Sequence, residues 1–527
     1  MKFRAAIILD NLKISQWQQS ALEQAKEYLD LKLILNCTNT SNQKKPLKHF
    51  FYYIINLISL RNRESRHNKF RTNYLQVIDF ESIYRGSWQS IPDDVVESLS
   101  DLKIDVIVRF GMGLLTISEE LSHYNILSFH HGNPAKYRGR PAGFYEIINK
   151  EKKCGIIVQK LSNKLDAGKI LAFAECKVEN YSYKKTSINL YNSSKPLLLK
   201  ALRNLEKDNN IDIGVEGKIY TLPSNKIVIK FITILIKNFI LRIFYGIFFE
   251  KKWEVSLHRL KLNCNQENIV DLSLGKKIPI KNDYSFYADP FFSCDENKIY
   301  LEALSKKEGI GKILEISSSN LHDQKIILEG GHYSYPFCFK FDHKEHILPE
   351  VASHSSPFFL SLNYENNQKF FIQGLEDLRI IDSTLFQSCG HFYLFFGIYG
   401  DRNSNLHLWS SNNIFNKFKP HPDSPISMNP SFSRMAGKII SDGNNLFRLG
   451  QNNEEKYGKS INILKITKLT PHEYSESLSG SIKMSDRLGP HTFNLDSKGN
   501  ILIDHYKESF SLSAGLKRIK LKLARRN

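Results

Sequence analysis

Short apolar runs alternate with amphipathic stretches through the first part of the chain. Strands are predicted for the apolar runs at Ala5–Leu9, Leu31–Asn36, Leu75–Phe80, Asp105–Phe110, Gly155–Gln159 and Ile170–Val178. Helical periodicity is present at Trp17–Tyr28 and again at Ser187–Leu205. This alternation predicts an open α/β sheet, in which the loops at the carboxyl ends of the strands form the ligand crevice.

From Trp253 onward the pattern changes to short apolar strands separated by turns rich in Asn, Asp, Gly and Ser. Weakly similar segments recur about every fifty residues, at Ala288–Phe292, Ser334–Phe337, Ile381–Leu385, Ser433–Gly437 and Gly489–Phe493. Each is followed, after a polar turn, by a second apolar strand. Five all-β repeats predict a five-bladed β-propeller over residues 253–510, with the innermost strands presenting side chains to a central channel.

A long apolar run, Ile227–Phe249, separates these two patterns. Lys230, Lys237 and Arg242 interrupt it, so we do not expect it to span a membrane. An interfacial helix with its cations at lipid headgroups and a helix buried between domains both stay open. The predicted organisation is an α/β domain at 1–222, a basic apolar linker helix at 223–252, the propeller at 253–510 and a basic tail at 511–527, which is either solvated or bound to headgroups.

Composition and charge narrow the class of protein. The 527 residues are 41% hydrophobic and 24% charged, as in ordinary globular proteins. The net charge of +19 indicates an acidic partner, such as nucleotide phosphates or anionic lipid, unless it reflects a genomic bias towards Lys. The seven scattered cysteines predict a reducing compartment and no metal site. With no signal peptide expected, we predict a cytoplasmic protein, with possible peripheral contact at the inner face of the membrane.

Polar chemistry is concentrated in the stretch Ser128–Ile148, S-F-H-H-G-N-P-A-K-Y-R-G-R-P-A-G-F-Y-E-I-I. It follows one predicted strand, and the segment Leu165–Leu171, L-D-A-G-K-I-L, follows the next. Both loops would open into the same crevice. A His from the first loop and an Asp from the second could then form an acid/base pair, with the carboxylate orienting the imidazole.

This stretch resembles the folate-dependent formyltransferases, the fold shared by methionyl-tRNA, glycinamide-ribonucleotide and sugar-nucleotide N-formyltransferases. The resemblance covers roughly residues 1–210 and implies a Rossmann-like domain that takes its formyl group from 10-formyltetrahydrofolate. Registering the motif on Tyr137-Arg138-Gly139 places the family's catalytic His on His130 and its Asp on Asp166. The family's oxyanion-binding Asn falls on Ser128, a departure from the pattern, and Asn133 is a candidate to replace it. The pterin is expected beside Gly111, Met112, Gly113, Leu114 and Leu165.

The acceptor of the formyl group is less closely defined. Tyr137, Arg138 and Arg140 are expected to bind the substrate, and the two arginines suit a phosphate. A propeller follows the catalytic domain where the resembled tRNA enzymes carry a barrel. We therefore expect an amino sugar, linked to a nucleotide or a lipid, in surface polysaccharide synthesis, and we do not expect nucleic acid as a partner.

The A-D-P-F-F…Y-L-E-A pattern of the second half resembles the propellers of family-43-like glycosidases and, more closely, the domain found beside glucosaminyl-inositolphosphorylceramide transferases. The polar residues expected at the channel are Asp289, Glu302, Glu350, Asp382, Arg434, Gln451 and His491. They could bind a glycan or simply satisfy backbone groups. Two alternatives to a formyltransferase follow: a non-catalytic glycan-binding scaffold with a degenerate formyltransferase fold, or a glycosyl-transfer or glycosidase enzyme acting in the propeller.

Overall fold

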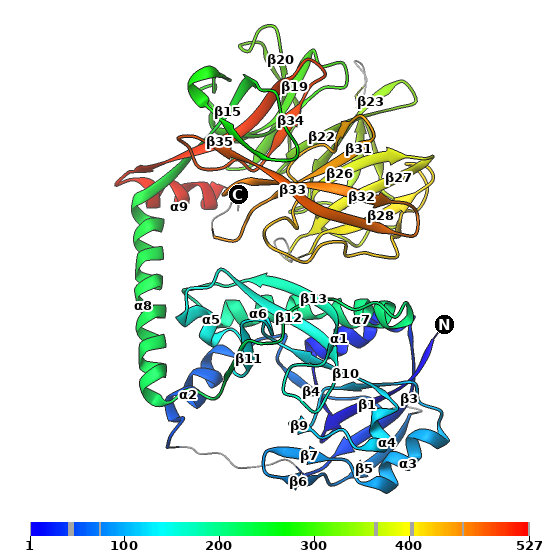
Figure 1. The fold of residues 1–527 in the computed structure, drawn as a ribbon. Helices are drawn as coiled ribbons and strands as arrows, with labels where there is room; N and C mark the ends of the chain where they lie inside the picture. The colour runs from blue at the N-terminus through cyan, green and yellow to red at the C-terminus, as the bar shows by residue number, and fades with distance from the viewer. Residues whose placement is uncertain are drawn as a thin grey trace. The chain divides into compact units, whose positions relative to one another are not determined.

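The computed structural model describes residues 2–39, 47–72, 75–362, 367–400, 405–455 and 458–524. The chain divides into two compact units, Met1–Phe239 and Ile240–Asn527. The division falls inside helix α8 (Asn225–Phe248), which occupies the long apolar run of the sequence. Figure 1 follows the chain through both units.

Among the described residues, unit 1 is centred on a nine-stranded sheet, of which seven strands follow in the order β5-β3-β1-β8-β10-β12-β13. The first five strands are parallel and the last two are antiparallel to their neighbours. Their bounds are β1 (Phe3–Asp10), β3 (Leu29–Cys37), β5 (Gln76–Phe80), β8 (Val106–Arg109), β10 (Asn125–His130), β12 (Lys153–Lys160) and β13 (Lys169–Lys177). The predicted open α/β sheet is therefore present, and six of these seven strands lie within one or two residues of the predicted runs. Strand β10, which includes Ser128 and His130, was not predicted; these residues were expected in a loop.

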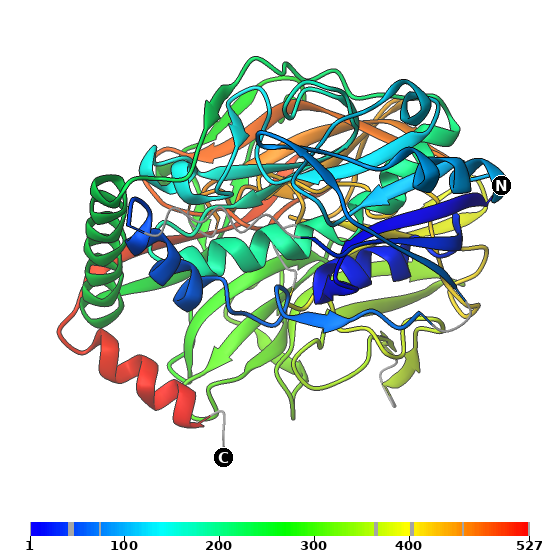
Figure 2. The same ribbon diagram turned by 90° about the horizontal axis from the view of Figure 1, so that it is seen from below.

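Helices pack on both faces of this sheet. On one face α1 (Gln16–Gln24), α6 (Tyr183–Ser194) and α7 (Leu197–Glu206) lie together, as Figure 2 shows. On the other, α3 (Asp93–Asp101) and α4 (Glu119–Ser122) contribute Val95, Leu99 and Leu121 to a core that includes Ala6 and Ile8 of β1. The alternation of side chains along β1 thus supplies both cores.

Smaller elements complete unit 1. They are the edge strands β2 (Lys13–Ser15) and β4 (His67–Lys69), a three-stranded sheet of β6 (Ile83–Arg85), β7 (Trp88–Ser90) and β9 (Leu114–Leu115), the pair β11 (Tyr137–Gly139) and β14 (Lys218–Tyr220), and helices α2 (Phe50–Ser59) and α5 (Phe144–Ile148).

The single helix predicted at Ser187–Leu205 is in fact two. Helix α6 ends at Ser194 and α7 begins at Leu197, with Pro196 between them. A proline lacks the N–H that a helix interior requires and clashes with the preceding turn, but it is tolerated at a helix start. Both helices still cover β13, so the break changes their direction and not the face they bury.

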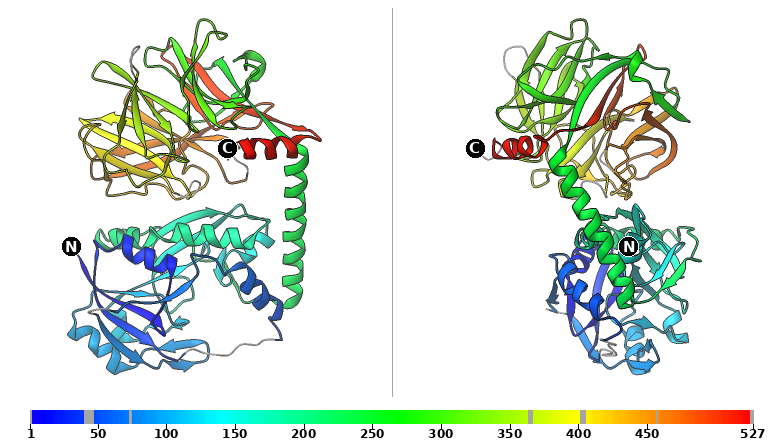
Figure 3. Two further views of the ribbon diagram at one scale, coloured as in Figure 1. Left: turned by 180° about the vertical axis from the view of Figure 1, so that it is seen from behind. Right: turned by 90° about the vertical axis from the view of Figure 1, so that its left-hand side faces the viewer.

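Over the part of the chain that the structure describes, unit 2 is built from five sheets of four or five strands. Three of them are each formed by four consecutive strands. The first contains β18 (Tyr284–Phe292), β19 (Lys298–Ser305), β20 (Gly311–Ser317) and β21 (Gln324–Leu328), and the second contains β22 (Ser334–Phe341), β23 (Lys344–Glu350), β24 (Phe358–Ser361) and β25 (Gln368–Phe371). The third contains β26 (Ile380–Ser388), β27 (His391–Ile398), β28 (His407–Ser411) and β29 (Lys419–Pro420). Figure 3 shows them from two further sides.

The other two sheets join strands from both ends of the unit. One contains β30 (Ile440–Asp442), β31 (Asn445–Gln451), β32 (Ile461–Leu469), β33 (Tyr474–Met484) and β16 (Glu267–Val270). The other contains β34 (Phe493–Leu495), β35 (Asn500–Phe510), β15 (Phe249–Arg259) and β17 (Lys276–Lys277). A 3-10 turn (Leu272–Leu274) and helix α9 (Ala514–Ala524) complete the unit.

Three of the five predicted repeats share a backbone device. Asp289, Tyr335 and Asp382 all have positive φ, of 51°, 44° and 48°, at an irregularity in β18, β22 and β26 respectively. The fourth repeat differs, because Ser433–Gly437 lies outside the named strands and contributes an isolated bridge between Met435 and Gly450. The five sheets agree in number with the predicted blades, while their closure into a propeller stays a prediction.

Helix α8 has mostly exposed side chains, with Val228 and Phe231 as its buried residues. Among the residues that the structure describes, no helix combines the length and the apolar character needed to cross a bilayer. Much of the predicted basic tail forms α9, and its last residues, 525–527, lie outside the described part of the chain.

Candidate functional site

The predicted acid/base pair is assembled in unit 1. His130 is the last residue of β10, and its Nδ1 lies 3.3 Å from Oδ2 of Asp166. Its Nε2 lies 3.1 Å from the backbone carbonyl oxygen of Tyr137. The imidazole thus faces two acceptors, and it can donate to both only as the imidazolium. Both side chains are largely shielded, with 7% of His130 and 15% of Asp166 exposed, so their interaction is weakly screened.

The loop after β10 is held against this pair by backbone contacts. The Gly139 N–H donates to Oδ2 of Asp166 at 2.7 Å, and β11 pairs in parallel with β14. Gly132 is required for the close approach, because a Cβ there would lie 2.6 Å from His130 Nε2 and 2.8 Å from the Tyr137 carbonyl oxygen. The sequence G-N-P-A-K-Y-R-G therefore brings a carbonyl and an amide to the His–Asp pair.

A strained turn between β12 and β13 presents Asp166. Its φ is +47°, a region that non-glycine residues rarely adopt. The Gly168 N–H donates to Oε1 of the buried Gln159 at 2.9 Å. Gly168 also passes so close to β12 that a Cβ would lie 2.0 Å from the Lys160 carbonyl oxygen. The L-D-A-G motif is thus explained by the turn geometry that places the carboxylate.

Ser128 contacts a residue that the sequence analysis missed. Arg109 pairs in register with Ser128 across β8 and β10, and its Nε and Nη2 donate to the Ser128 hydroxyl at 3.2 and 2.7 Å. The third guanidinium nitrogen of Arg109, Nη1, donates to the carbonyl oxygens of Met112 and Gly113. Burial lowers the pKa of Arg109, while Asp166 and Asp10 act in the opposite direction. The sequence feature that could have revealed Arg109 is its position, as a charged residue at the end of the apolar run V-I-V-R.

The predicted pterin contacts at residues 111–114 are joined to this site through Arg109, which binds the carbonyl oxygens of Met112 and Gly113. Among the turn residues 111–114, Met112 N–H donates to Oδ1 of Asp10 at 2.8 Å and Gly113 N–H donates to Oε1 of Gln89. Several of these backbone groups are therefore already bonded within the protein. A cleft of about 310 Å³ opens between residues 117–126 and residues 160–163. Its walls include Ile117, Ile126, Leu161, Ser162 and Asn163. The second of these segments continues through Leu165 to Asp166.

The predicted substrate residues lie around His130. Tyr137, Arg138 and Arg140 line a pocket of about 10 Å³ together with His130 and Tyr220. Arg138 donates to the Val215 carbonyl oxygen at 2.8 Å, and Arg140 is exposed. The neighbouring His131 lines the same pocket; burial lowers its pKa to about 3, and its Nε2 lies 2.9 Å from the Ser194 hydroxyl.

Asn133 is engaged by its own loop. Its side-chain oxygen accepts from the Ala135 N–H at 3.0 Å, and its Cα packs on Gly155, where a Cβ would approach to 2.8 Å. Among the hydrogen bonds of the described residues, none joins Asn133 to His130 or Asp166. The arrangement accounts for Asn133 as a turn residue, and its role as an oxyanion donor stays a prediction.

Unit 2 contains a second polar cluster, which includes Asp289 and Asp382 at the irregularities of β18 and β26. His491 lies between two carboxylates, with Nδ1 2.6 Å from Asp504 Oδ2 and Nε2 3.2 Å from Asp289 Oδ1. Burial acts against the charged imidazole, yet the two carboxylates raise the pKa of His491. Burial raises the pKa of Asp289, although the charge of His491 acts in the opposite direction. Burial also acts to raise the pKa of Asp504, but the interaction with His491 and the hydrogen bonds from backbone amides outweigh it and lower this pKa.

Further members of this cluster come from the neighbouring sheets. Arg434 binds Asp382 through Nε and, at 3.1 Å, through Nη2, and Gln451 Nε2 lies 3.3 Å from the same carboxylate. The Asp382 N–H donates to Glu350 Oε2 at 3.1 Å. Burial, with the Asp382 charge, raises the pKa of Glu350 to about 8. A carboxylate paired with a guanidinium therefore lies beside another, Glu350, whose protonated form is favoured.

Six of the seven predicted channel residues thus meet in one cluster. The seventh, Glu302, is buried beside Gly311, where a Cβ would lie 2.5 Å from its Oε1. Sequence analysis missed Asp504 and Tyr335. The Tyr335 N–H donates to Asp289 at 3.2 Å, and its hydroxyl accepts from the Gly437 N–H at 2.9 Å. Asp504, inside the apolar strand I-L-I-D-H-Y, was detectable as a charge on a buried face.

Two groups of side chains have metal-ligand atoms within 4.8 Å of one another among the described residues: Asp289, His491 and Asp504, and Cys294, Cys338 and Glu345. In the first group the atoms are engaged as ion pairs with one another. In the second, the two sulfurs lie 3.2 Å apart and Cys338 Sγ lies 2.9 Å from Glu345 Oε1. Internal bonding accounts for both groups.

The chain resembles two classes of transferase. A family model described as glucosamine inositolphosphorylceramide transferase 1, N-terminal, matches residues 276–494. The glucosamine inositolphosphorylceramide transferase 1 of Oryza sativa subsp. japonica is 27% identical over 210 residues, which is 36% of this chain and 28% of the rice protein. The chain therefore spans less than a third of the length of that relative.

The second class is the formyltransferases. Methionyl-tRNA formyltransferase of Borrelia hermsii is 30% identical over 130 residues, covering 23% of this chain and 40% of that enzyme. Among solved structures, glycinamide ribonucleotide transformylase 1 from Symbiobacterium toebii aligns with a TM-score of 0.29 and 13% identity over 42% of this chain and 94% of that one. The chain contains a formyltransferase-like domain, joined to a region similar to the N-terminal part of the plant transferases.

Proposed function

We propose that unit 1 is an N-formyltransferase that moves a formyl group from 10-formyltetrahydrofolate to the amine of an amino sugar linked to a nucleotide or a lipid. The observation that carries this proposal is the His130–Asp166 pair, because it combines a donor and a carboxylate in a shielded crevice. The matching curated formyltransferases support the class of reaction.

The residues of the chain suit the proton transfers of this reaction. When the amine nitrogen bonds to the formyl carbon, the carbonyl oxygen becomes an oxyanion and the nitrogen gains a positive charge. His130 would donate to that oxyanion after releasing the Tyr137 carbonyl, and Asp166 would accept the amine proton through water. The C–N bond to the folate then breaks, and the proton passes to the leaving nitrogen.

Ser128 would supply the second oxyanion donor with the help of Arg109. A hydroxyl that accepts two bonds from a guanidinium has its own proton directed away from that cation and becomes a stronger donor. Ser128 and His130 lie two residues apart on β10, so their side chains leave the same face of the strand. This arrangement compensates for the shorter side chain at the position where the resembled family carries Asn.

The folate would lie in the cleft of about 310 Å³, and the predicted contacts at Gly111–Leu114 stay a prediction. The cleft combines apolar walls with hydroxyl and amide groups, as a pterin requires, and it adjoins the turn that carries Asp166. The bound folate would supply the activated formyl group. Leu161, Ser162 and Asn163 are among the residues of this chain that would line the folate site.

The amino-sugar acceptor is supported by the cations beside His130 and by the second unit. Arg138 and Arg140 would bind phosphate of a sugar nucleotide or lipid. We propose that the five sheets of unit 2 are the blades of a propeller and hold the glycan. The similarity of residues 276–494 to transferases named for a glycosylated ceramide favours a carbohydrate ligand there.

The test is folate binding followed by formyl transfer with the full chain. Titration with 5-formyltetrahydrofolate should give micromolar binding in wild type, His130→Ala and Asp166→Ala, since the cleft is intact in all three. Formyl transfer to an amino-sugar nucleotide should fall at least about 100-fold in both variants but not in His123→Ala, an exposed His of the same unit. Absence of folate binding to wild type at millimolar ligand would reject the proposal.

A second candidate function belongs to the cluster in unit 2. Glu350, with its raised pKa, is suited to protonate a leaving sugar oxygen, and Asp289 or Asp382 to act as the base or nucleophile, which is the division of roles in glycosyl chemistry. Release of an aryl leaving group from an aryl glycoside, lost in Glu350→Gln and kept in His130→Ala, would support this candidate. Retention of that release in Glu350→Gln would reject it.

A further inference from the structure

An exposed apolar surface is present where α8 ends and α9 begins, within unit 2. On α8, Ile240, Ile243, Phe244 and Ile247 occupy positions i, i+3, i+4 and i+7 and are between 44% and 59% exposed. On α9, Leu516, Ile519 and Leu523 form a second stripe, each more than half exposed. Such spacing places each set along one face of its helix. We name these residues, with Phe510, the α8–α9 patch.

The two stripes are joined by close packing. The rings of Phe244 and Phe248 lie 4.9 Å apart, and those of Phe248 and Phe510 lie 5.9 Å apart. Gly515, at the start of α9, passes so close to α8 that a Cβ would lie 3.3 Å from the Ile247 carbonyl oxygen. Arg518 donates to the carbonyl oxygens of Gly246 and Phe249. Figure 3 shows α9 beside the end of α8.

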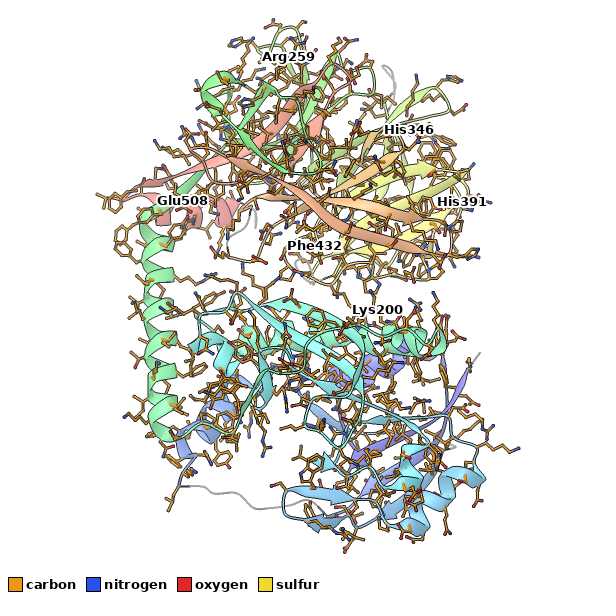
Figure 4. The ribbon with its side chains drawn as sticks, in the orientation of Figure 1. Lys200, Arg259, His346, His391, Phe432 and Glu508 are labelled. Carbon is orange, nitrogen blue, oxygen red and sulfur yellow. The ribbon has the colours of Figure 1, made fainter. Side chains whose placement is uncertain are left out.

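The surroundings of the patch are strongly cationic. Residues 240–252 and 507–524 contain eight Lys and Arg but two carboxylates, Glu250 and Glu508. Both carboxylates are engaged: Glu250 binds Lys517 at 2.9 Å, and Glu508, labelled in Figure 4, accepts from the Tyr245 hydroxyl at 2.7 Å. Helix α9 itself carries Lys517, Arg518, Lys520 and Lys522 and no acid. An occupant of this surface must therefore be apolar and anionic together.

A second copy of the chain does not meet that requirement. Each copy carries a net charge of +19, and a contact between two α8–α9 patches would bring the same cations together. An anionic bilayer surface does meet it, because acyl chains accept the leucines, isoleucines and phenylalanines while the long cationic side chains extend to the headgroup phosphates. Phe510 has no polar group and belongs with the leucines and isoleucines on the side that contacts the acyl chains.

We infer that the α8–α9 patch docks unit 2 onto anionic phospholipid surfaces. The apolar residues supply insertion at the headgroup boundary, and the cations supply attraction to anionic lipid. This inference is independent of formyl transfer, which takes place in unit 1. It assigns to α8 and α9 the role of an interfacial anchor that lies on the membrane without crossing it.

Vesicle flotation with the full chain tests the inference. Wild type should float with vesicles of phosphatidylcholine and phosphatidylglycerol at 7:3 and bind vesicles of pure phosphatidylcholine at least about tenfold more weakly. Salt at high concentration should release it from the anionic vesicles. Wild type that fails to float with the anionic vesicles at low salt would overturn the inference.

Matched variants identify the surface responsible. Phe510→Ser should weaken partitioning about tenfold, whereas Phe371→Ser, at a phenylalanine of unit 2 that is also 60% exposed, should leave it unchanged. Lys520→Glu with Lys522→Glu should weaken it at least about 30-fold, and Lys261→Glu with Lys276→Glu, two exposed lysines outside the patch, should have a much smaller effect.

The charge variants keep the test valid if Phe510→Ser fails to fold, because Lys520 and Lys522 are exposed on α9. If the patch variant and the control lysine variant lose vesicle binding to the same extent, binding depends on the overall charge of the protein, and the assignment to the α8–α9 patch is overturned. Light scattering tests whether the patch is a protein interface. If the wild type forms an oligomer and does not bind vesicles, and if Phe510→Ser dissociates that oligomer, the patch is an interface between copies of the chain and the inference is overturned.

Discussion

Ser128 offers the candidate site one hydroxyl, and the chemistry of that hydroxyl depends on Arg109. We expect Ser128→Ala to lower kcat for formyl transfer about 100-fold, since one oxyanion donor is lost. Arg109→Lys should lower kcat to a similar extent, because a lysine cannot make both bonds to the hydroxyl. The double variant should then lose little more than either single one. Steady-state kinetics on the four proteins measures this coupling.

Ser193→Ala, at a fully buried serine of α6, is the control for loss of a hydroxyl. Additive losses in the double variant, after correction for any change in Tm, would contradict the dependence of Ser128 on Arg109.

Glu146 is a buried carboxyl that should make the stability of unit 1 depend on pH. Burial raises its pKa to about 7, although the Cys154 thiol donates to its Oε1 at 3.0 Å. A raised folded-state pKa stabilises the fold fully below the unfolded pKa, and that stability is lost as the pH rises through about 7. Glu146→Gln removes this titration and keeps an acceptor oxygen.

Between pH 4.5 and pH 8 the wild type should therefore lose about 2–4 kcal/mol of unfolding free energy relative to Glu146→Gln. Urea unfolding at both pH values measures the difference. The exposed Glu216→Gln should show the pH dependence of the wild type. A constant difference between Glu146→Gln and wild type across this range would contradict the prediction.

At the scale of elements, the hairpin of β12 and β13 determines where Asp166 stands. Gly168→Ala would place a Cβ against the Lys160 carbonyl oxygen, so the strands must separate or the turn must move. We expect a loss of about 2–3 kcal/mol in stability together with weaker folate binding. Chemical unfolding and ligand titration test this. Gly214→Ala, whose Cβ would meet Ala135 at an ordinary 3.8 Å, should be neutral in both.

Elements were largely predictable where the pattern was local. The apolar runs predicted six of the seven central strands of unit 1 but not β10, where Ser128 and His130 lie. The motifs around His130 and Asp166 predicted the pair, although β12 runs antiparallel to β10 and the loop after β12 has to fold back to bring Asp166 to His130. Pro196 was overlooked inside a periodic stretch, and one expected helix became two.

Contacts fixed by the register between strands could not be predicted. The pairing of Arg109 with Ser128 depends on how β8 aligns with β10, and that of Asp504 with His491 depends on contacts within unit 2. A sequence pattern shows which face of a strand is buried but not which residue lies opposite. The alignment of neighbouring strands is therefore where the structure added most to the candidate sites.

At the scale of the whole molecule, the charged centre of unit 2 should control the stability of that unit alone. His491→Ala leaves Asp289 and Asp504 as buried carboxylates without their cation, which typically costs about 3–5 kcal/mol. Hydrogen exchange followed by mass spectrometry should show faster exchange throughout the five sheets of unit 2 and unchanged exchange in the sheet of unit 1.

His391→Ala, at a residue of β27 labelled in Figure 4, is the matched control and should leave exchange in unit 2 unaltered. Faster exchange in both units of His491→Ala would contradict the assignment of this cluster to unit 2 alone.

The long ladder between β15 and β35 has a consequence for how this architecture can be rearranged. It pairs Phe249 with Phe510 and continues for eleven residues to Arg259 and Asn500, so the backbone enters and leaves the five sheets at neighbouring points. A domain with adjacent ends can be inserted into a loop of another protein, or have its ends joined and be opened elsewhere. The exposed turn at Asp342-His343, between β22 and β23, is a natural position for new termini in such a circular permutant.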